Sequence, residues 1–188
     1  MDHTEKCLHW EDLFRGRIID VHRDRVSLPD GSEALREIVE HSGGVAVIPV
    51  DDEGYVWCVR QFRYAFGRHM LEVPAGKLEP GEAPLDCAVR ELSEETGFTA
   101  ERYTYLGSMY PSPGYCLETL HLYLATGLKP GKAHLDQGEF LDVERHSLDE
   151  LVAMVLENQL PDAKTAMAVL KAKLLLEDKE KHECQEPF

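Results

Sequence analysis

Hydrophobic and polar positions alternate through the first part of the chain. Arg17–His22 and Arg25–Leu28 have the pattern of two short strands, and Ala34–His41 alternates like a third. Pro29-Asp30-Gly31 has the composition of a turn. The pattern therefore predicts a small antiparallel β element within residues 1–41.

The next segment is more continuously apolar. Val45–Val50 predicts a buried strand, and the turn residues Asp51–Gly54 lead into another strand at Tyr55–Val59. These two strands are expected to form a hairpin. A later strand is expected at Leu117–Ala125, where leucines at alternate positions mark one buried side.

Helical periodicity is clearest over residues 84–96. Pro84 suits a first helical turn and Gly97 suits a helix end. The predicted apolar face contains Leu85, Ala88, Val89 and Leu92. Further helices are expected near Ser147 and after Pro161. Strands on both sides of a central helix, with helices after them, predict an α/β sandwich around a mixed sheet.

Charge and cysteine content narrow the classes of partner. A net charge of −15 argues against a nucleic-acid binder, which needs a basic face to neutralise phosphates. The apolar runs are too short for a membrane span. The 5 cysteines are widely spaced, with no zinc-like grouping, and this indicates reduced thiols and a cytoplasmic location.

Acidic residues gather on the predicted central helix. Glu91 lies three and four positions before Glu94 and Glu95, so the carboxylates project near one another. Arg90 precedes Glu94 by four positions and can hold its carboxylate. Such a cluster is either a solvated helix face or a site for a hard divalent cation that takes oxygen ligands.

Flanking glycines favour the second interpretation. Gly76 is followed after five residues by Glu82 and, after seven more, by Arg-Glu-Leu-Ser-Glu-Glu-Thr-Gly-Phe, residues 90–98. This segment matches the Nudix box at every fixed position, and the chain resembles the Nudix hydrolase superfamily. The resemblance implies an α/β/α sandwich that hydrolyses nucleoside diphosphates linked to another group.

The resemblance also implies roles for individual residues. It assigns divalent-metal binding, with Mg²⁺ expected and Mn²⁺ possible, to Ala75 (through its carbonyl), Glu82, Glu91 and Glu95. Glu94 and Arg90 are implied as catalytic residues, Arg90 by orienting the carboxylates.

Segments outside the box resemble one branch of the superfamily, the ADP-ribose pyrophosphatases. The similar segments are Arg36–His41, Arg60–Arg63, Pro111–Tyr115 with the following Glu118, and Asp162–Thr165. The branch implies substrate binding by Arg36, Arg63, Ser112 and Glu118. Trp10 or Phe14 is a candidate for stacking on the adenine. The implied reaction is hydrolysis of ADP-ribose to AMP and ribose 5-phosphate.

The branch also implies a catalytic base on a late loop. Glu139 is the best match within His134–Asp142, and Asp136 is a second candidate because Gln137-Gly138 interrupts the acidic run.

Two other functions stay open. One is pyrophosphatase activity on another nucleotide sugar, a dinucleotide or an oxidised nucleotide, and the other is a non-catalytic nucleotide-sensing module. Residues 42–180 are expected to form the Nudix domain and residues 181–188 a disordered tail. Residues 1–41 are expected to mediate a homodimer, because their alternating strands look too exposed to stand alone.

Overall fold

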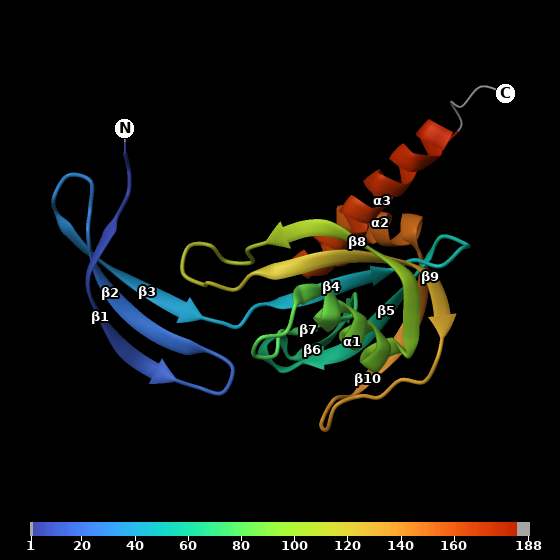
Figure 1. The fold of residues 1–188 in the computed structure, drawn as a ribbon, viewed down its shortest axis with the longest axis horizontal. Helices are drawn as coiled ribbons and strands as arrows, with labels where there is room; N and C mark the ends of the chain where they lie inside the picture. The colour runs from blue at the N-terminus through green and yellow to red at the C-terminus, as the bar shows by residue number, and fades with distance from the viewer. Residues whose placement is uncertain (1, 184–188) are drawn as a thin grey trace. The chain divides into compact units, whose positions relative to one another are not determined.

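The computed structural model describes residues 2–183, and the chain divides into two compact units (Figure 1). Met1–Gly43 and Tyr110–Thr119 form the first unit. Gly44–Met109 and the chain from residue 120 onward form the second. Within the described residues, no helix is long and apolar enough to cross a membrane.

The first unit contains an antiparallel sheet with the strand order β1-β2-β3. Its strands are β1 (Lys6–Arg15), β2 (Asp20–Ser27) and β3 (Glu33–Glu40). The prediction of two short strands before the turn is wrong. β2 is continuous, because it pairs with β3 along its whole length, from Asp20 to Ser27. β1 is not predicted from the sequence, because its residues are all exposed and carry no buried stripe.

Tyr110–Thr119 is held on β3 by backbone hydrogen bonds. The Val39 N–H donates to the Tyr115 carbonyl at 2.7 Å, and the Leu117 N–H donates to the Val39 carbonyl at 2.9 Å. A segment that follows β8 (Phe98–Met109) in the chain therefore completes the amino-terminal unit.

The second unit is built on a mixed sheet with the order β7-β4-β9-β8. Its strands are β7 (Ala75–Lys77), β4 (Gly44–Pro49), β9 (Leu120–Pro130) and β8 (Phe98–Met109). β4 and β9 are parallel, and the other neighbours are antiparallel. The predicted mixed sheet is confirmed. As predicted, Leu120, Leu122 and Leu124 share one apolar cluster, whereas Tyr123 and Ala125 belong to the other.

A second sheet has the order β10-β5-β6. Its strands are β10 (Leu141–Ser147), β5 (Tyr55–Arg63) and β6 (Arg68–Glu72). The predicted hairpin of β4 with β5 is wrong. The turn forms, but only a single bridge, Val50 to Val56, joins the two segments. β4 is buried along its whole length and pairs inside the mixed sheet, whereas β5 pairs with β6 and β10.

Helices cover both faces of the mixed sheet. α1 (Pro84–Thr96) packs on one face, while α2 (Leu148–Leu156) and α3 (Ala163–Glu183) pack on the other. The predicted sandwich is therefore confirmed. Part of the expected carboxyl-terminal tail, residues 184–188, lies outside the described residues, and residues 181–183 continue α3.

The buried face of α1 differs from the prediction. Ala88 and Leu92 are fully buried as expected, but Leu85 and Val89 are 45% and 40% exposed. Their places are taken by Cys87 and by the acidic residues Glu91 and Glu95. The acids thus share the helix side that faces the core instead of lying opposite it.

Candidate active site

Two carboxylates of α1 are buried, although burial of an ionised group is costly. Glu91 is 9% exposed and Glu95 is 4% exposed. Their positions one turn apart place both on the core-facing side of the helix. Burial raises the pKa of Glu95 to about 8, and repulsion by Glu91 adds to this rise. Burial also raises the pKa of Glu91. Ionising two neighbouring buried carboxylates is costly, and a bound cation would lower that cost.

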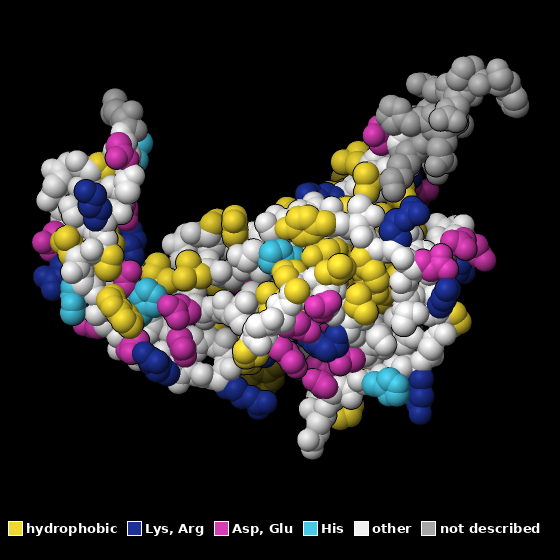
Figure 2. Space-filling view, in the orientation of Figure 1, with side chains coloured by type: hydrophobic (Ala, Val, Ile, Leu, Met, Phe, Trp, Pro, Cys, Tyr) yellow, Lys and Arg dark blue, Asp and Glu magenta, His cyan; other side chains and the backbone are white. Residues whose placement is uncertain are grey.

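Arg90 connects the remaining acids of the cluster. Its guanidinium donates to Glu91 Oε1 at 2.7 Å and to Glu94 Oε2 at 2.9 Å. It also donates to both oxygens of Glu82, at 2.8 and 3.0 Å. Figure 2 shows acidic side chains gathered around basic ones over α1. Arg90 therefore contacts three carboxylates, and its implied catalytic role of orienting them stays a prediction.

Glu82 joins the loop before α1 to the helix. Besides its bonds from Arg90, its carboxylate accepts the backbone N–H of Glu79 at 3.0 Å. The hydrogen bonds from Arg90 lower the pKa of Glu82 to about 2. Glu82 is thus an ionised group that shapes the loop, and its role as a metal ligand stays a prediction.

The strand β7 lies directly against the buried acids. The Ala75 N–H donates to Glu95 Oε2 at 3.1 Å. A Cβ atom on Gly76 would lie 1.8 Å from Glu91 Oε1, so only glycine allows this close approach. The close packing of β7 against this carboxylate therefore depends on the missing side chain of Gly76.

The donor types suit Mg²⁺, which takes oxygen ligands. Glu91 and Glu95 supply carboxylate oxygens, and the adjoining Ala75 supplies a backbone carbonyl. Among the described residues, no three acidic, imidazole or thiol side chains converge as a group that could hold a metal ion. Backbone, substrate or water oxygens would have to complete the coordination.

The loop that carries Glu139 is anchored to the end of α1. The His134 N–H donates to the Glu94 carbonyl at 2.9 Å. The loop backbone also passes close to Gly97, whose positive φ of 76° ends the helix. The negative charge of Glu139 contributes to the raised pKa of Glu91 and of Glu95. The assignment of the base to Glu139, with Asp136 as the second candidate, stays a prediction.

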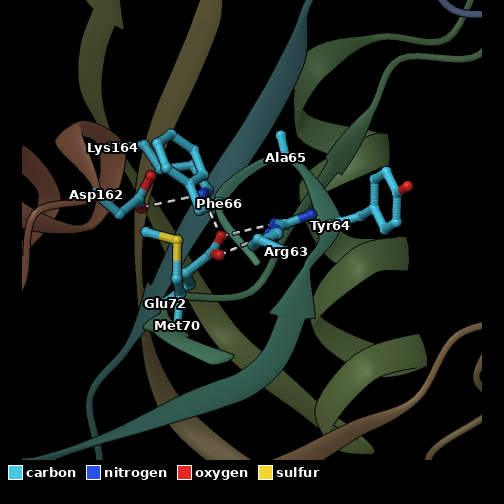
Figure 3. A pocket seen from close by; sticks show the side chains of 8 residues that line it. All are labelled: Arg63, Tyr64, Ala65, Phe66, Met70, Glu72, Asp162 and Lys164. Atoms are coloured by element: carbon cyan, nitrogen blue, oxygen red, sulfur yellow. Dashed lines mark hydrogen bonds and ion pairs between the residues drawn. The ribbon is translucent and has the colours of Figure 1, made fainter. Parts of the chain in front are cut away.

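A pocket of about 410 Å³ lies beside β5 and β6 (Figure 3). Its lining includes Arg63, the short helix η1 (Tyr64–Phe66), Met70 and Lys164. Both Nε and Nη2 of Arg63 donate to Glu72, each at 2.6 Å. The positive charge of Arg63 also lowers the pKa of Glu95 slightly, against the larger effect of burial.

The other predicted substrate residues belong to the first unit. Arg36 donates to both oxygens of Glu5, at 2.9 and 2.6 Å. The Ser112 carbonyl accepts backbone N–H groups within its own loop. Glu118 lies 3.6 Å from His41 Nδ1. Their roles in substrate binding stay predictions.

Glu72, Asp162 and Lys164 form a charged group that the sequence analysis does not assign to the site. The sequence carries one signal for it. Glu72 is a lone acid between Leu71 and Val73 in an apolar run, where an unpaired charge would be unfavourable.

Comparison with protein families agrees with this fold and site. A family described as the NUDIX domain matches residues 40–170. A second, the nucleoside diphosphate sugar hydrolase N-terminal domain, matches residues 5–39. The chain belongs to the Nudix hydrolase family.

Individual relatives cover most of the chain. A Bacillus subtilis (strain 168) protein named ADP-ribose pyrophosphatase is 44% identical over 167 residues, covering 88% of this chain and 90% of the relative. A Bacillus methanolicus protein named methanol dehydrogenase activator is 43% identical with the same coverage. A solved structure titled as an ADP compounds hydrolase matches with a TM-score of 0.83 at 23% identity, covering 93% of this chain and 95% of that one. This last likeness concerns the fold.

Proposed function

We propose that this protein hydrolyses the diphosphate bond of ADP-ribose, giving AMP and ribose 5-phosphate, with Mg²⁺ as its metal and Mn²⁺ as a substitute. The observation that carries the proposal is the buried pair Glu91 and Glu95, with Gly76 of β7 lying close against the Glu91 carboxylate. The relative named ADP-ribose pyrophosphatase supports this choice of substrate.

The metal, once bound, would neutralise negative charge on the diphosphate. Glu91, Glu95 and the Ala75 carbonyl would hold it, while Arg90 keeps the neighbouring carboxylates in place. Arg63 would bind a phosphate through its remaining N–H groups.

Glu139 would accept a proton from the attacking water. The water oxygen forms a bond to one phosphorus, and the bond from that phosphorus to the bridging oxygen breaks. The bridging oxygen leaves with the other phosphate, so one water is consumed for each diphosphate cleaved. Residues 131–140 join β9 to β10 and are mostly exposed, which suits a base that reaches the site when substrate is bound.

The location and assembly of the protein are part of the proposal. Cys7, Cys58, Cys87 and Cys116 are free thiols, which supports a cytoplasmic location.

A homodimer through β1–β3 is supported by the exposed hydrophobic side chains of that sheet (Figure 2). Leu8 is 54% exposed and Leu35 is 59% exposed, and apolar surface of this kind favours association.

Product analysis on a substrate panel tests the proposal. The panel contains ADP-ribose, ADP-glucose, GDP-mannose, NADH and 8-oxo-dGTP, each with Mg²⁺. We expect preferred cleavage of ADP-ribose and a loss of about 100-fold or more in kcat for Glu95→Gln, because a metal ligand is removed. The exposed Glu101 on β8 provides a matched control, and Glu101→Gln should keep wild-type kcat.

Preference for another substrate would contradict the assignment to ADP-ribose and leave the metal site standing. Absence of cleavage with every divalent metal would favour a nucleotide-sensing module instead.

A further inference from the structure

Glu72 is a buried carboxylate that the mechanism does not use. It ends β6 and is only 1% exposed. Burial alone would raise its pKa, but hydrogen bonds from Arg63 and the charge of Lys164 outweigh this and lower it. The Lys164 ammonium donates to Glu72 Oε2, and Arg63 binds both oxygens. One buried carboxylate thus holds two cations side by side.

Each cation keeps donors for a ligand. Arg63 uses Nε and Nη2 for Glu72, and no protein partner for its Nη1 occurs within the described residues. Lys164 uses two of its three N–H bonds, one for Glu72 and one for Asp162 at 2.9 Å. Both side chains line the pocket, where Figure 3 shows them on either side of Glu72.

The pocket has no surplus of positive charge. Arg63 and Lys164 are balanced by Glu72 and Asp162. Attraction of an anion therefore depends on where the free donors point, more than on net charge. Glu72, which fixes the direction of these N–H groups, is then as important for anion binding as Arg63 and Lys164 themselves.

The residues that directly follow Glu72 hydrogen-bond to the neighbouring elements, including a buried acid of α1. The Val73 N–H donates to Thr165 Oγ1 at 3.0 Å, and this buried hydroxyl donates to Asp162 Oδ2 at 2.6 Å. Two residues further on, Ala75 donates to Glu95. Glu72 thus stands in a fixed frame that spans the pocket and the proposed metal loop.

We propose that Glu72 is a positioning residue for substrate: it aims Arg63 and Lys164 so that their remaining N–H groups bind one phosphate of the diphosphate. This inference rests on the proposed function, since the pocket must receive that substrate. It also makes Lys164 a substrate-binding residue.

Glu72→Gln separates positioning from simple charge neutralisation, because the two predict opposite signs. A mere counter-charge, once removed, would leave the pocket more positive, and KM would fall. Loss of positioning should raise KM by about tenfold, the effect of one weakened charge-assisted hydrogen bond, with kcat changed much less.

Glu144→Gln is the matched control. Glu144 also accepts from Nε and Nη2 of an arginine on β5, Arg60, but this pair lies outside the pocket lining. The KM of the Glu144→Gln variant should equal that of the wild type. An equal rise in KM in both variants would overturn the inference.

A double variant removes the effect of lost stability. Glu72→Gln leaves two cations facing a neutral amide, and adding Lys164→Met removes one of them. Circular dichroism should show Tm recovering in the double variant while KM stays raised. Recovery of KM together with Tm would overturn the inference, because Lys164 as a substrate-binding residue and Glu72 as its positioning residue both require KM to stay raised.

Binding of inorganic pyrophosphate, measured by calorimetry without metal, keeps the inference separate from the proposed function. We expect the wild type to bind pyrophosphate about tenfold more tightly than Glu72→Gln does. This difference would support positioning even if ADP-ribose is not cleaved. Cleavage of ADP-ribose with no change in KM or in pyrophosphate affinity would overturn positioning alone, as would failure of the wild type to bind pyrophosphate.

Discussion

Arg90 and Arg63, both in the second unit, use the N–H groups of their guanidinium in different ways. Arg90 donates to three carboxylates, and these bonds raise its pKa. Arg63 donates to one carboxylate and keeps an N–H group for the pocket. A guanidinium with all its donors occupied by protein orients other groups, whereas one with a donor left can bind a ligand.

Gly76→Ala should displace Glu91, because the new Cβ would overlap its carboxylate. We expect kcat to fall by about 100-fold, as for other small misplacements of catalytic groups, with a shift in the Mg²⁺ concentration that gives half activity. Metal-dependent steady-state kinetics measure both. Gly54→Ala is the control, since it strains a positive φ but meets no neighbouring atom, and its Mg²⁺ dependence should match the wild type.

Glu144 should contribute to stability in an acid-dependent way. The hydrogen bond from Arg60 lowers its folded pKa to about 2, below the value of about 4.3 for an unfolded glutamate. Its contribution is therefore present above the unfolded pKa and is lost as pH falls toward the folded pKa. Urea unfolding from about pH 5, just above the unfolded pKa, down to about pH 2, the folded pKa, should show a smaller acid-induced loss in Glu144→Gln. Parallel curves would contradict this.

At the scale of elements, the sequence is informative where local signals agree. Pro84 and Gly97 mark both ends of α1, and the structure confirms them. The buried face could not be predicted from periodicity alone, because Leu85 is exposed and Glu91 is buried, the reverse of what their hydrophobicity predicts. β8 is missed for a similar reason: it alternates weakly and forms by pairing with β9.

Leu92→Ala and Leu85→Ala test the corrected face of α1. Leu92 is fully buried, so its truncation should lower the free energy of unfolding by about 2–5 kcal/mol. Leu85 is 45% exposed, and its truncation should cost about 1 kcal/mol or less. Chemical denaturation of both variants measures the difference. Equal losses would show that the helix is packed as the sequence pattern predicts.

At the scale of the whole molecule, the order of residues along the chain does not show which compact unit each predicted site residue lies in. Glu82 to Glu95, Glu139 and Arg63 lie in the second unit, whereas Arg36, Ser112 and Glu118 lie in the first. The box predicts the local cluster because it is continuous in sequence. Pairing of Tyr110–Thr119 with β3 depends on backbone hydrogen bonds between distant segments, for which the sequence gives no local signal.

The proposed dimer can be tested by placing charge on the exposed apolar residues of the first unit. Leu8→Lys combined with Leu35→Lys should convert a dimer into a monomer, because burying two ammonium groups at an interface is unfavourable. Light scattering after size-exclusion chromatography measures the mass. Leu156→Lys, at a side chain 76% exposed on α2, should leave the mass unchanged. A monomeric wild type would contradict the proposal.

The segment Tyr110–Thr119 has a consequence for synthesis on the ribosome. β1, β2 and β3 leave the exit tunnel first, but the loop that bonds to Val39 emerges only after β8 has been made. Until then the backbone groups of Val39 lack their native partner and can pair with another strand. Slow translation through β4–β8 would prolong that exposure, so codon choice in this stretch is expected to influence the yield of correctly assembled protein.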